Sequence, residues 1–201
     1  MGRRDSLDVD IFQPLWAAGW QWLWIVAGGL FLGGYFIFEF GDLLEGAGII
    51  LGSVALAALG IRYVDTNYEA VLDSGTEQAQ SALLDLVGFD DDSVVSSTST
   101  AGQTLFLVEP AREYHLTTLA VGDDSFVVHD DATVSLAHRY YTVGDDAHTY
   151  AYESIESVGF DAGTLRITST DGSTASHELP DVPTSALSAV RERMSGIERD
   201  D

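Results

Sequence analysis

The feature that most constrains this chain is a long apolar run near its N-terminus. From Trp16 to Phe38 the sequence reads WAAGWQWLWIVAGGLFLGGYFIF, 23 residues without an acidic or basic side chain. A helix needs about 20 apolar residues to cross the hydrocarbon core of a bilayer. A signal peptide has a shorter apolar region and a small-residue cleavage site, and no such site precedes Glu39. The run therefore predicts a retained transmembrane helix over 16–38.

A second apolar run follows at 43–64. Its uncharged centre, Gly46 to Ile61, has 16 residues and is slightly short for a span. Glu45 and Arg62 stand at its two ends, where long charged side chains can reach the interface. The intervening turn at 39–42 is only a few residues long, so we expect two antiparallel helices in contact.

Two glycine pairs indicate how these helices pack. Gly29 and Gly33 form one GxxxG pair, and Gly48 and Gly52 form another. Small residues let helix backbones approach closely in a bilayer, where no hydrophobic force joins helices. The pairs predict either the contact within the hairpin or a contact between two copies.

Tryptophan gathers in the first part of the first run. Tryptophan side chains prefer the membrane–water interface, so the cluster predicts an interfacial aromatic belt rather than a cofactor-stacking site. The four residues are Trp16, Trp20, Trp22 and Trp24.

The arginines give an orientation. Arg3 and Arg4 precede the first span and Arg62 ends the second, whereas the turn at 39–45 carries acidic residues and no cation. Because cations favour the cytoplasmic side, we expect a multi-pass protein of the cell membrane with both termini in the cytoplasm.

The rest of the chain is strongly acidic. The net charge is −23, with 32 acidic residues, nine arginines and no lysine. From Asp65 onward there are 26 acidic and six basic residues. At 1 M salt the Debye length falls to about 3 Å, which screens such repulsion. In this composition the chain resembles proteins of haloarchaea that live with molar internal salt.

Other interpretations of the charge are weaker. The acidic runs lack the ligand spacing of an EF-hand calcium loop. Nucleic-acid binding needs clustered cations, so we expect no nucleic-acid partner. The chain has no cysteine, which excludes disulfides, thiolate metal sites and cysteine nucleophiles.

The sequence divides into three regions: 1–64 with the tail and two spans, a connecting segment at 65–102, and a β-rich domain at 103–201. Within the connecting segment, Glu77–Val87 has the apolar spacing of a short amphipathic helix that packs on the domain. Asp90–Gly102 reads DDDSVVSSTSTAG, which is typical of a flexible linker or long loop.

The β-rich domain shows about seven short runs of strand-forming residues separated by Gly or Asp. Two GDD sequences, at 122–124 and 144–146, predict hairpin turns, as do the glycines at 163 and 172. The helical period of Pro183–Ile197 predicts a closing helix. The expected strands are Thr104–Val108, His115–Val121, Ser125–His129, Thr133–Val143, His148–Tyr152, Thr164–Thr168 and Thr174–Leu179.

The segment Ser125–Met194 resembles the prokaryotic membrane-anchored PH-like domains. The residues that carry the likeness are the I-x-x-V stretch Ile155–Val158, the Gly-x-Leu-x-Ile strand Gly163–Ile167 and the closing helix. The resemblance implies a PH-like fold of the α+β class and a scaffold for protein contacts beside the membrane. It does not extend to lipid-headgroup binding, since only Arg112 and Arg139 offer cations there.

Recognisable catalytic motifs are absent from the sequence, which has neither an HExxH nor a GxSxG pattern. We therefore predict no catalytic residue, metal or cofactor, and a non-catalytic interaction module that binds another protein or itself. One alternative is a small-molecule sensor or carrier; its site would lie near Tyr140, Tyr141, Tyr150 and Tyr152. Another is a membrane enzyme in which His129 and His138 cluster with nearby aspartates.

Overall fold

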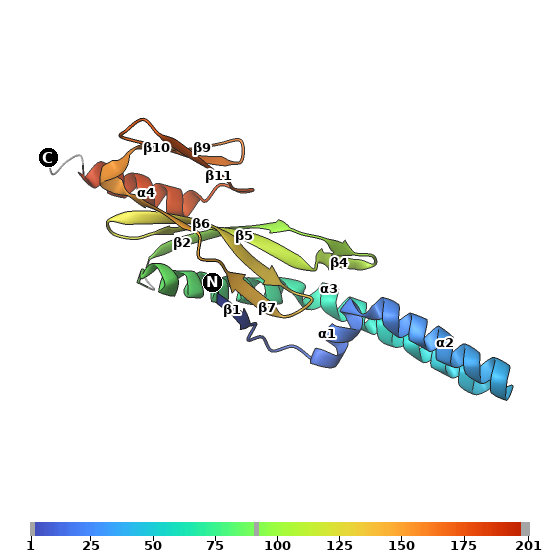
Figure 1. Cartoon of the computed structure of the whole chain (residues 1–201). Helices are drawn as coiled ribbons and strands as arrows, with labels where there is room; N and C mark the ends of the chain where they lie inside the picture. The colour runs from blue at the N-terminus through green and yellow to red at the C-terminus, as the bar shows by residue number, and fades with distance from the viewer. Residues whose placement is uncertain (1–2, 91–92, 198–201) are drawn as a thin grey trace. The chain divides into compact units, whose positions relative to one another are not determined.

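The computed structural model describes residues 3–90 and 93–197, which form two compact units. One unit, here called the helical unit, consists of 8–72 and 103–112. The other, the β module, consists of 3–7, 73–102 and the chain from 113 onward. Figure 1 follows the elements along the chain. A long helical region is followed by antiparallel strands and a C-terminal helix, as expected.

Two helices that begin in the helical unit are long and apolar enough to cross a membrane. They are α2 (Trp22–Phe40) and α3 (Leu43–Val87), joined by a short turn in which Gly41 is left-handed. The single helix expected from Trp16 to Phe38 is not continuous. The helix is interrupted at Gln21, and the residues before it form a separate helix, α1 (Gln13–Trp20).

Helix α3 is longer than predicted. Its 45 residues run without a break through the region where a separate helix was expected at 77–87. Residues up to Leu72 belong to the helical unit and the rest to the β module. The predicted packing face is present, because Ala79, Ala82 and Leu83 are buried. The helix ends at Val87, and the next residue, Gly88, has a positive φ of 72° that suits a helix C-terminus.

The first glycine pair lies at the contact between α2 and α3. Gly29 and Gly33 are the two buried residues of α2. A Cβ on Gly29 would overlap Ser53 Oγ, and one on Gly33 would come within 2.5 Å of the Gly46 carbonyl oxygen. The close approach therefore requires glycine at these positions.

The second glycine pair does not face α2. A Cβ on Gly48 or Gly52 would meet open space, so the prediction that they form the helix contact is wrong for the hairpin. On α3 the contact is made by Gly46 and Ser53 instead. Gly46 and Gly48 differ by two residues, about 200° around a helix, so they cannot share a face.

The tryptophans separate into two groups. Trp16 and Trp20 on α1 are only 1% and 9% exposed and pack edge to face with ring centroids 6.1 Å apart. Gly19 of α1 touches the backbone of Gly60 on α3, which holds α1 against α3. The belt prediction is wrong for these two residues because they are buried in protein. Trp24 is 78% exposed.

A short hairpin completes the helical unit. It consists of β3 (Thr104–Leu105) and β4 (Val108–Ala111), where a single strand was expected. The indole N–H of Trp22 donates to the Phe106 carbonyl over 2.9 Å. The hairpin thus interrupts the β module in sequence but packs with the helices.

The first sheet of the β module is antiparallel, with strand order β1-β7-β6-β5-β2 and β8 also paired to β6. The strand β1, at the N-terminus, was not predicted. The single strand expected at Thr133–Val143 is instead the end of β6, a turn and β7. The bounds are β1 (Arg3–Ser6), β2 (Val94–Ala101), β5 (Glu113–Val121), β6 (Ser125–Ser135), β7 (Tyr140–Val143) and β8 (Ala147–Ala151).

Strand β2 stands where a linker was expected, so that prediction is wrong for Val94–Ala101; residues 91 and 92 lie outside the described part. The strand pairs along its whole length with β5. Its hydroxyls find partners inside the unit: Ser97 Oγ lies 2.6 Å from Thr118 Oγ1 and accepts from Gln80 Nε2 at 2.9 Å. These bonds make a serine- and threonine-rich strand compatible with a half-buried position.

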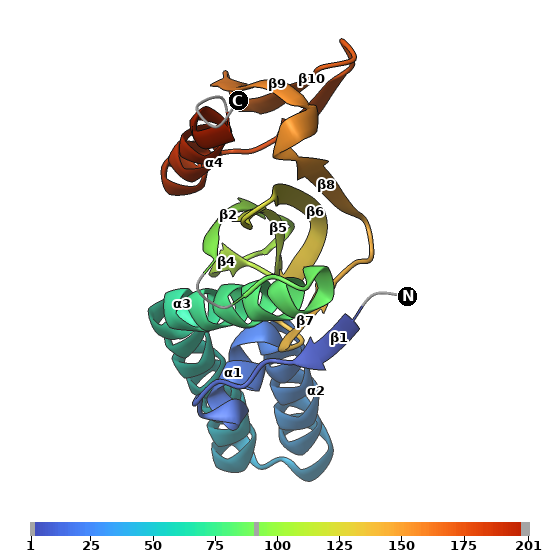
Figure 2. The same cartoon turned by 90° about the vertical axis from the view of Figure 1, so that its left-hand side faces the viewer.

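The second sheet has the order β11-β10-β9 and is connected to β8 by the short 3-10 helix η1 (Tyr152–Ser154). Figure 2 shows it beside α4. Side chains from both sheets and from α4 share one core that includes Phe126, Leu165 and Val190. The bounds are β9 (Ile155–Asp161), β10 (Thr164–Ser169), β11 (Thr174–Glu178) and α4 (Thr184–Ile197).

The closing helix was predicted correctly. Leu187 and Val190, which define its apolar face, are buried, and Met194 is partly buried against the same core. The side chain of Ile197 lies outside the described part of the structure.

Candidate functional site

Three side chains with metal-binding chemistry meet in the β module: Asp130 on β6, His148 on β8 and His177 on β11. One ligand atom from each lies within 4.8 Å of those from the other two. Asp130 and His148 are exposed, whereas His177 is only 7% exposed. Two of the three residues come from the first sheet and one, His177, comes from the strand β11 of the second.

Strand register explains why Asp130 and His148 share a face. His148 pairs with Val128 of β6, and Asp130 follows Val128 by two residues. Residues two apart on a strand point to the same side, so both side chains lie on the face that carries Val128 into the core. His177 stands two residues before the buried Leu179. Because residues two apart in an extended chain point to the same side, the His177 side chain also points inward.

The second GDD sequence lies next to this cluster, and it is not a hairpin turn. The strands on either side of it, β7 and β8, both pair with β6. Gly144–Asp146 therefore interrupts the pairing along one side of β6, as a β-bulge does. The Gly144 N–H donates to the Asp131 carbonyl over 2.7 Å, and a Cβ on Gly144 would overlap the Asp131 side chain. Such interruptions redirect neighbouring side chains.

The first GDD sequence does form the expected hairpin turn. It joins β5 to β6, and the Gly122 N–H donates to the Ser125 carbonyl over 2.9 Å. The Ala162–Gly163 turn between β9 and β10 was also predicted correctly, and both of its residues have positive φ.

The two ring nitrogens of His177 have different surroundings. Nδ1 lies 3.8 Å from Asp130 Oδ2, and Nε2 lies 2.8 Å from the Tyr150 hydroxyl oxygen. The rings of His177 and His148 have centroids 5.1 Å apart. Burial lowers the pKa of His177, and the nearby His148 lowers it further, while Asp130 acts in the opposite direction. Burial raises the pKa of Tyr150, and Asp130 adds to that rise.

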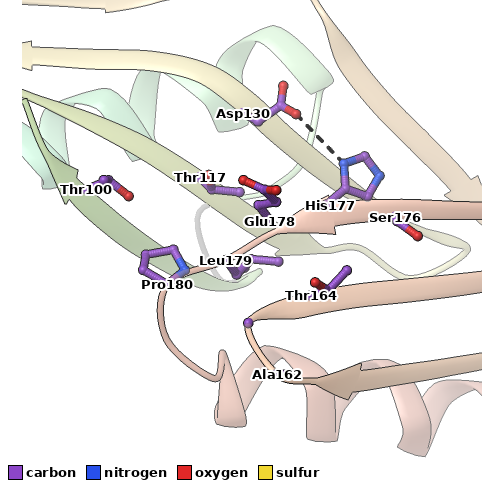
Figure 3. A pocket seen from close by; sticks show the side chains of 11 residues that line it. Thr100, Thr117, Asp130, Ala162, Thr164, Ser176, His177, Glu178, Leu179 and Pro180 are labelled. Atoms are coloured by element: carbon purple, nitrogen blue, oxygen red, sulfur yellow. Dashed lines mark ion pairs between the residues drawn. The ribbon is translucent and has the colours of Figure 1, made fainter.

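A cavity of about 660 Å³ opens beside the cluster, with Asp130 and His177 on its wall. Figure 3 shows these two side chains directed toward each other, with Glu178 nearby. The rest of the wall has as many polar as apolar residues. It is formed by Thr100, Thr117, Ala162, Gly163, Thr164, Ser176, Leu179 and Pro180.

The histidines named in the enzyme hypothesis lie elsewhere. His129 is fully buried, and its Nε2 lies 3.0 Å from the Gly144 carbonyl oxygen. His138 is exposed and stacks on Tyr140, with ring centroids 6.2 Å apart. The structure therefore brings together a different pair of histidines, His148 and His177, from the pair in the enzyme hypothesis.

The four tyrosines named in the sensor hypothesis separate into two environments. Tyr150 and Tyr152 pack on Phe126, with ring centroids 5.2 and 5.9 Å apart. Tyr140 and Tyr141 lie on β7, where the Arg4 guanidinium sits 3.7 Å above the Tyr140 ring. These environments do not support one tyrosine-lined site.

Comparisons with known proteins give little more. No family model matches the chain, and no curated protein matches it. A similar solved structure is described as the crystal structure of the C-terminal domain of an unknown protein from Leishmania infantum. It is 10% identical, covers 62% of this chain and 98% of that chain, and has a TM-score of 0.35. A likeness this distant says nothing about function.

Proposed function

We propose that this chain is a membrane-anchored interaction module of an extreme halophile, in which a helical hairpin holds a PH-like module at the cytoplasmic face. The carrying observation is the exposure of the apolar helices. In the apolar windows of α2 and α3 only 11% and 17% of residues are buried. A core helix of a soluble protein would be mostly buried, whereas lipid is the medium that such a surface fits.

Strand pairing supports a common side of the membrane for the segments before the first span and after the second. Arg3–Ser6 pairs with Tyr140–Val143 across β1 and β7, so these residues before the first span belong to the β module. Two spans between them are consistent with that arrangement. Arg3, Arg4 and Arg62 favour the cytoplasm as the shared side.

The β3–β4 hairpin supports an interfacial position for the start of α2. Its tip exposes Phe106 and Leu107, which are 76% and 57% exposed, beside Trp22. Leu107 has φ of 69°, a conformation that costs a non-glycine residue about 1–2 kcal/mol. An exposed leucine in a strained position fits a tip that touches the headgroup region, where aromatic and apolar side chains are favoured.

The PH-like part of the proposal draws on two antiparallel sheets and a closing helix with one shared core. The net charge of −23 argues against anionic lipid as the partner and fits a halophile. The partner is another protein or a second copy of the chain.

Cysteine labelling tests the topology, because the chain contains no cysteine. Glu39→Cys lies at the end of α2 and Glu156→Cys on β9; both positions are exposed, and each variant removes one acidic charge. In right-side-out vesicles a membrane-impermeant maleimide should label Glu39→Cys, and Glu156→Cys only after detergent is added. Labelling of Glu156→Cys in intact vesicles would refute the cytoplasmic assignment.

Crosslinking in native membranes at molar salt tests the interaction. We expect a discrete crosslinked species that contains a partner or a second copy. A strictly monomeric protein in detergent, together with no crosslinked product in membranes, would leave the interaction module without support.

A further inference from the structure

We propose that Asp130, His148 and His177 form a binding site for a divalent first-row transition metal ion, of which Zn²⁺ fits the ligands best. Imidazole nitrogen suits zinc, copper, iron and nickel, whereas calcium and magnesium prefer oxygen ligands alone. Two histidines and one carboxylate also form the protein part of several open zinc sites. This inference is independent of the membrane topology, because all three residues belong to the β module.

The spacing of the ligand atoms suits a shared ion. Zinc–nitrogen and zinc–oxygen bonds of about 2.0–2.2 Å at tetrahedral angles place neighbouring ligand atoms about 3.4 Å apart. His177 Nδ1 and Asp130 Oδ2 are 3.8 Å apart, too far for a hydrogen bond but close to that value. His148 and Asp130 are exposed side chains on the surface of the site, so small rotations can bring them to an ion.

The Tyr150 hydroxyl occupies Nε2 of His177, so Nδ1 is the ring nitrogen that faces Asp130. The hydroxyl lies 2.8 Å from Nε2, on the far side of the ring from Asp130. When Nε2 carries the proton, its N–H donates a hydrogen bond to the tyrosine oxygen. Nδ1 then has a free electron pair directed toward Asp130. A second hydrogen bond of this kind fixes the tautomer and orientation of metal-binding histidines.

The three protein ligands leave coordination positions open. Asp130 and His177 line the cavity of about 660 Å³, so water reaches the ion from that side. The ligands come from β6 and β8 of the first sheet and from β11 of the second. A bound ion therefore ties the two sheets together and stabilises the folded module by mass action.

Titration of the 201-residue chain in detergent with Zn²⁺ tests the site, with isothermal calorimetry and the midpoint of thermal unfolding as readouts. We expect one saturable site and a rise in the unfolding midpoint. Asp130→Asn and His148→Ala change exposed residues, so the module should still fold, and each should weaken Zn²⁺ binding at least tenfold. His138→Ala, an exposed histidine outside the cluster, is the matched control and should bind like the wild type.

Tyr150→Phe tests the orienting hydrogen bond. It should lower Zn²⁺ affinity by about 10-fold or more while the apo protein keeps its circular dichroism spectrum. Binding that Ca²⁺ reproduces, or that survives in both Asp130→Asn and His148→Ala, would arise from surface carboxylates and overturn the proposal. The absence of any saturable Zn²⁺ binding would also overturn it.

Discussion

At the scale of single residues, Tyr152 shows how the β module uses a buried hydroxyl. The residue is 3% exposed, and its hydroxyl donates to the Gly122 carbonyl over 3.1 Å. The Arg193 guanidinium donates to the same carbonyl oxygen. Burial raises the pKa of Tyr152, and the nearby Arg193 partly opposes that rise.

Replacement of this hydroxyl should lower stability. Tyr152→Phe removes one buried hydrogen bond, and we expect the free energy of unfolding to fall by about 1 kcal/mol. Because the folded-state pKa lies above the unfolded value of about 10, the unfolded chain loses its proton first as pH rises, and stability falls above pH 10. The variant should show a shallower fall in unfolding midpoint between about pH 9 and 11.

Tyr140→Phe is the matched control, since it deletes a hydroxyl outside this core. Thermal unfolding followed by circular dichroism at each pH provides the measurement. Equal alkaline profiles for Tyr152→Phe and the wild type would contradict the assigned role.

At the scale of elements, two glycine pairs that look alike in the sequence have different surroundings in the helix hairpin. Gly33 touches α3, and Gly48 faces open space. Gly33→Leu forces α2 and α3 apart and should destabilise the hairpin by about 1–3 kcal/mol, as overpacking does in other cores. Gly48→Leu makes the same chemical change on the open face and should leave the unfolding midpoint nearly unchanged.

The measurement is thermal unfolding of the two variants in the same detergent, where the four tryptophans report on the helical unit. A larger loss for Gly48→Leu than for Gly33→Leu would show that the helices pack through the other face.

Elements also show where local sequence signals stop. The period of Pro183–Ile197 identified α4, because an amphipathic helix carries its own signal. Val94–Ala101 reads as a linker because serine and threonine dominate it, yet it pairs with β5 throughout. The partners of its Ser97 hydroxyl are Gln80 and Thr118, which are 17 and 21 residues away in the sequence. A pattern of neighbouring residues cannot reveal partners at that distance.

At the scale of the whole molecule, the charge should make stability depend on salt. A net charge of −23 creates repulsion that extends about 10 Å at 0.1 M salt and about 3 Å at 1 M. We expect the unfolding midpoint of the full chain to rise continuously between 0.1 and 2 M KCl, as measured by circular dichroism.

Sucrose at equal osmolarity is the control, because it stabilises through exclusion from the surface without screening charge. A midpoint that rises as much in sucrose as in KCl, or that falls in KCl, would contradict the halophilic interpretation.

The sequence by itself determined the two apolar helices, the strands β5, β8, β10 and β11 and the closing helix, because each has a period or composition that its own residues carry. The strands β1, β2 and β9 were not predicted. Tertiary structure decided where the first helix is interrupted, at Gln21, and which helix Gly29 and Gly33 contact. It determined that the second GDD sequence forms a bulge and not a hairpin turn. It also decided the meeting of Asp130, His148 and His177. An inward-facing histidine could be read from the alternation around His177, between Ala175 and Leu179. Its partners depend on strand register and on the packing of two sheets, which are properties of contacts between distant residues.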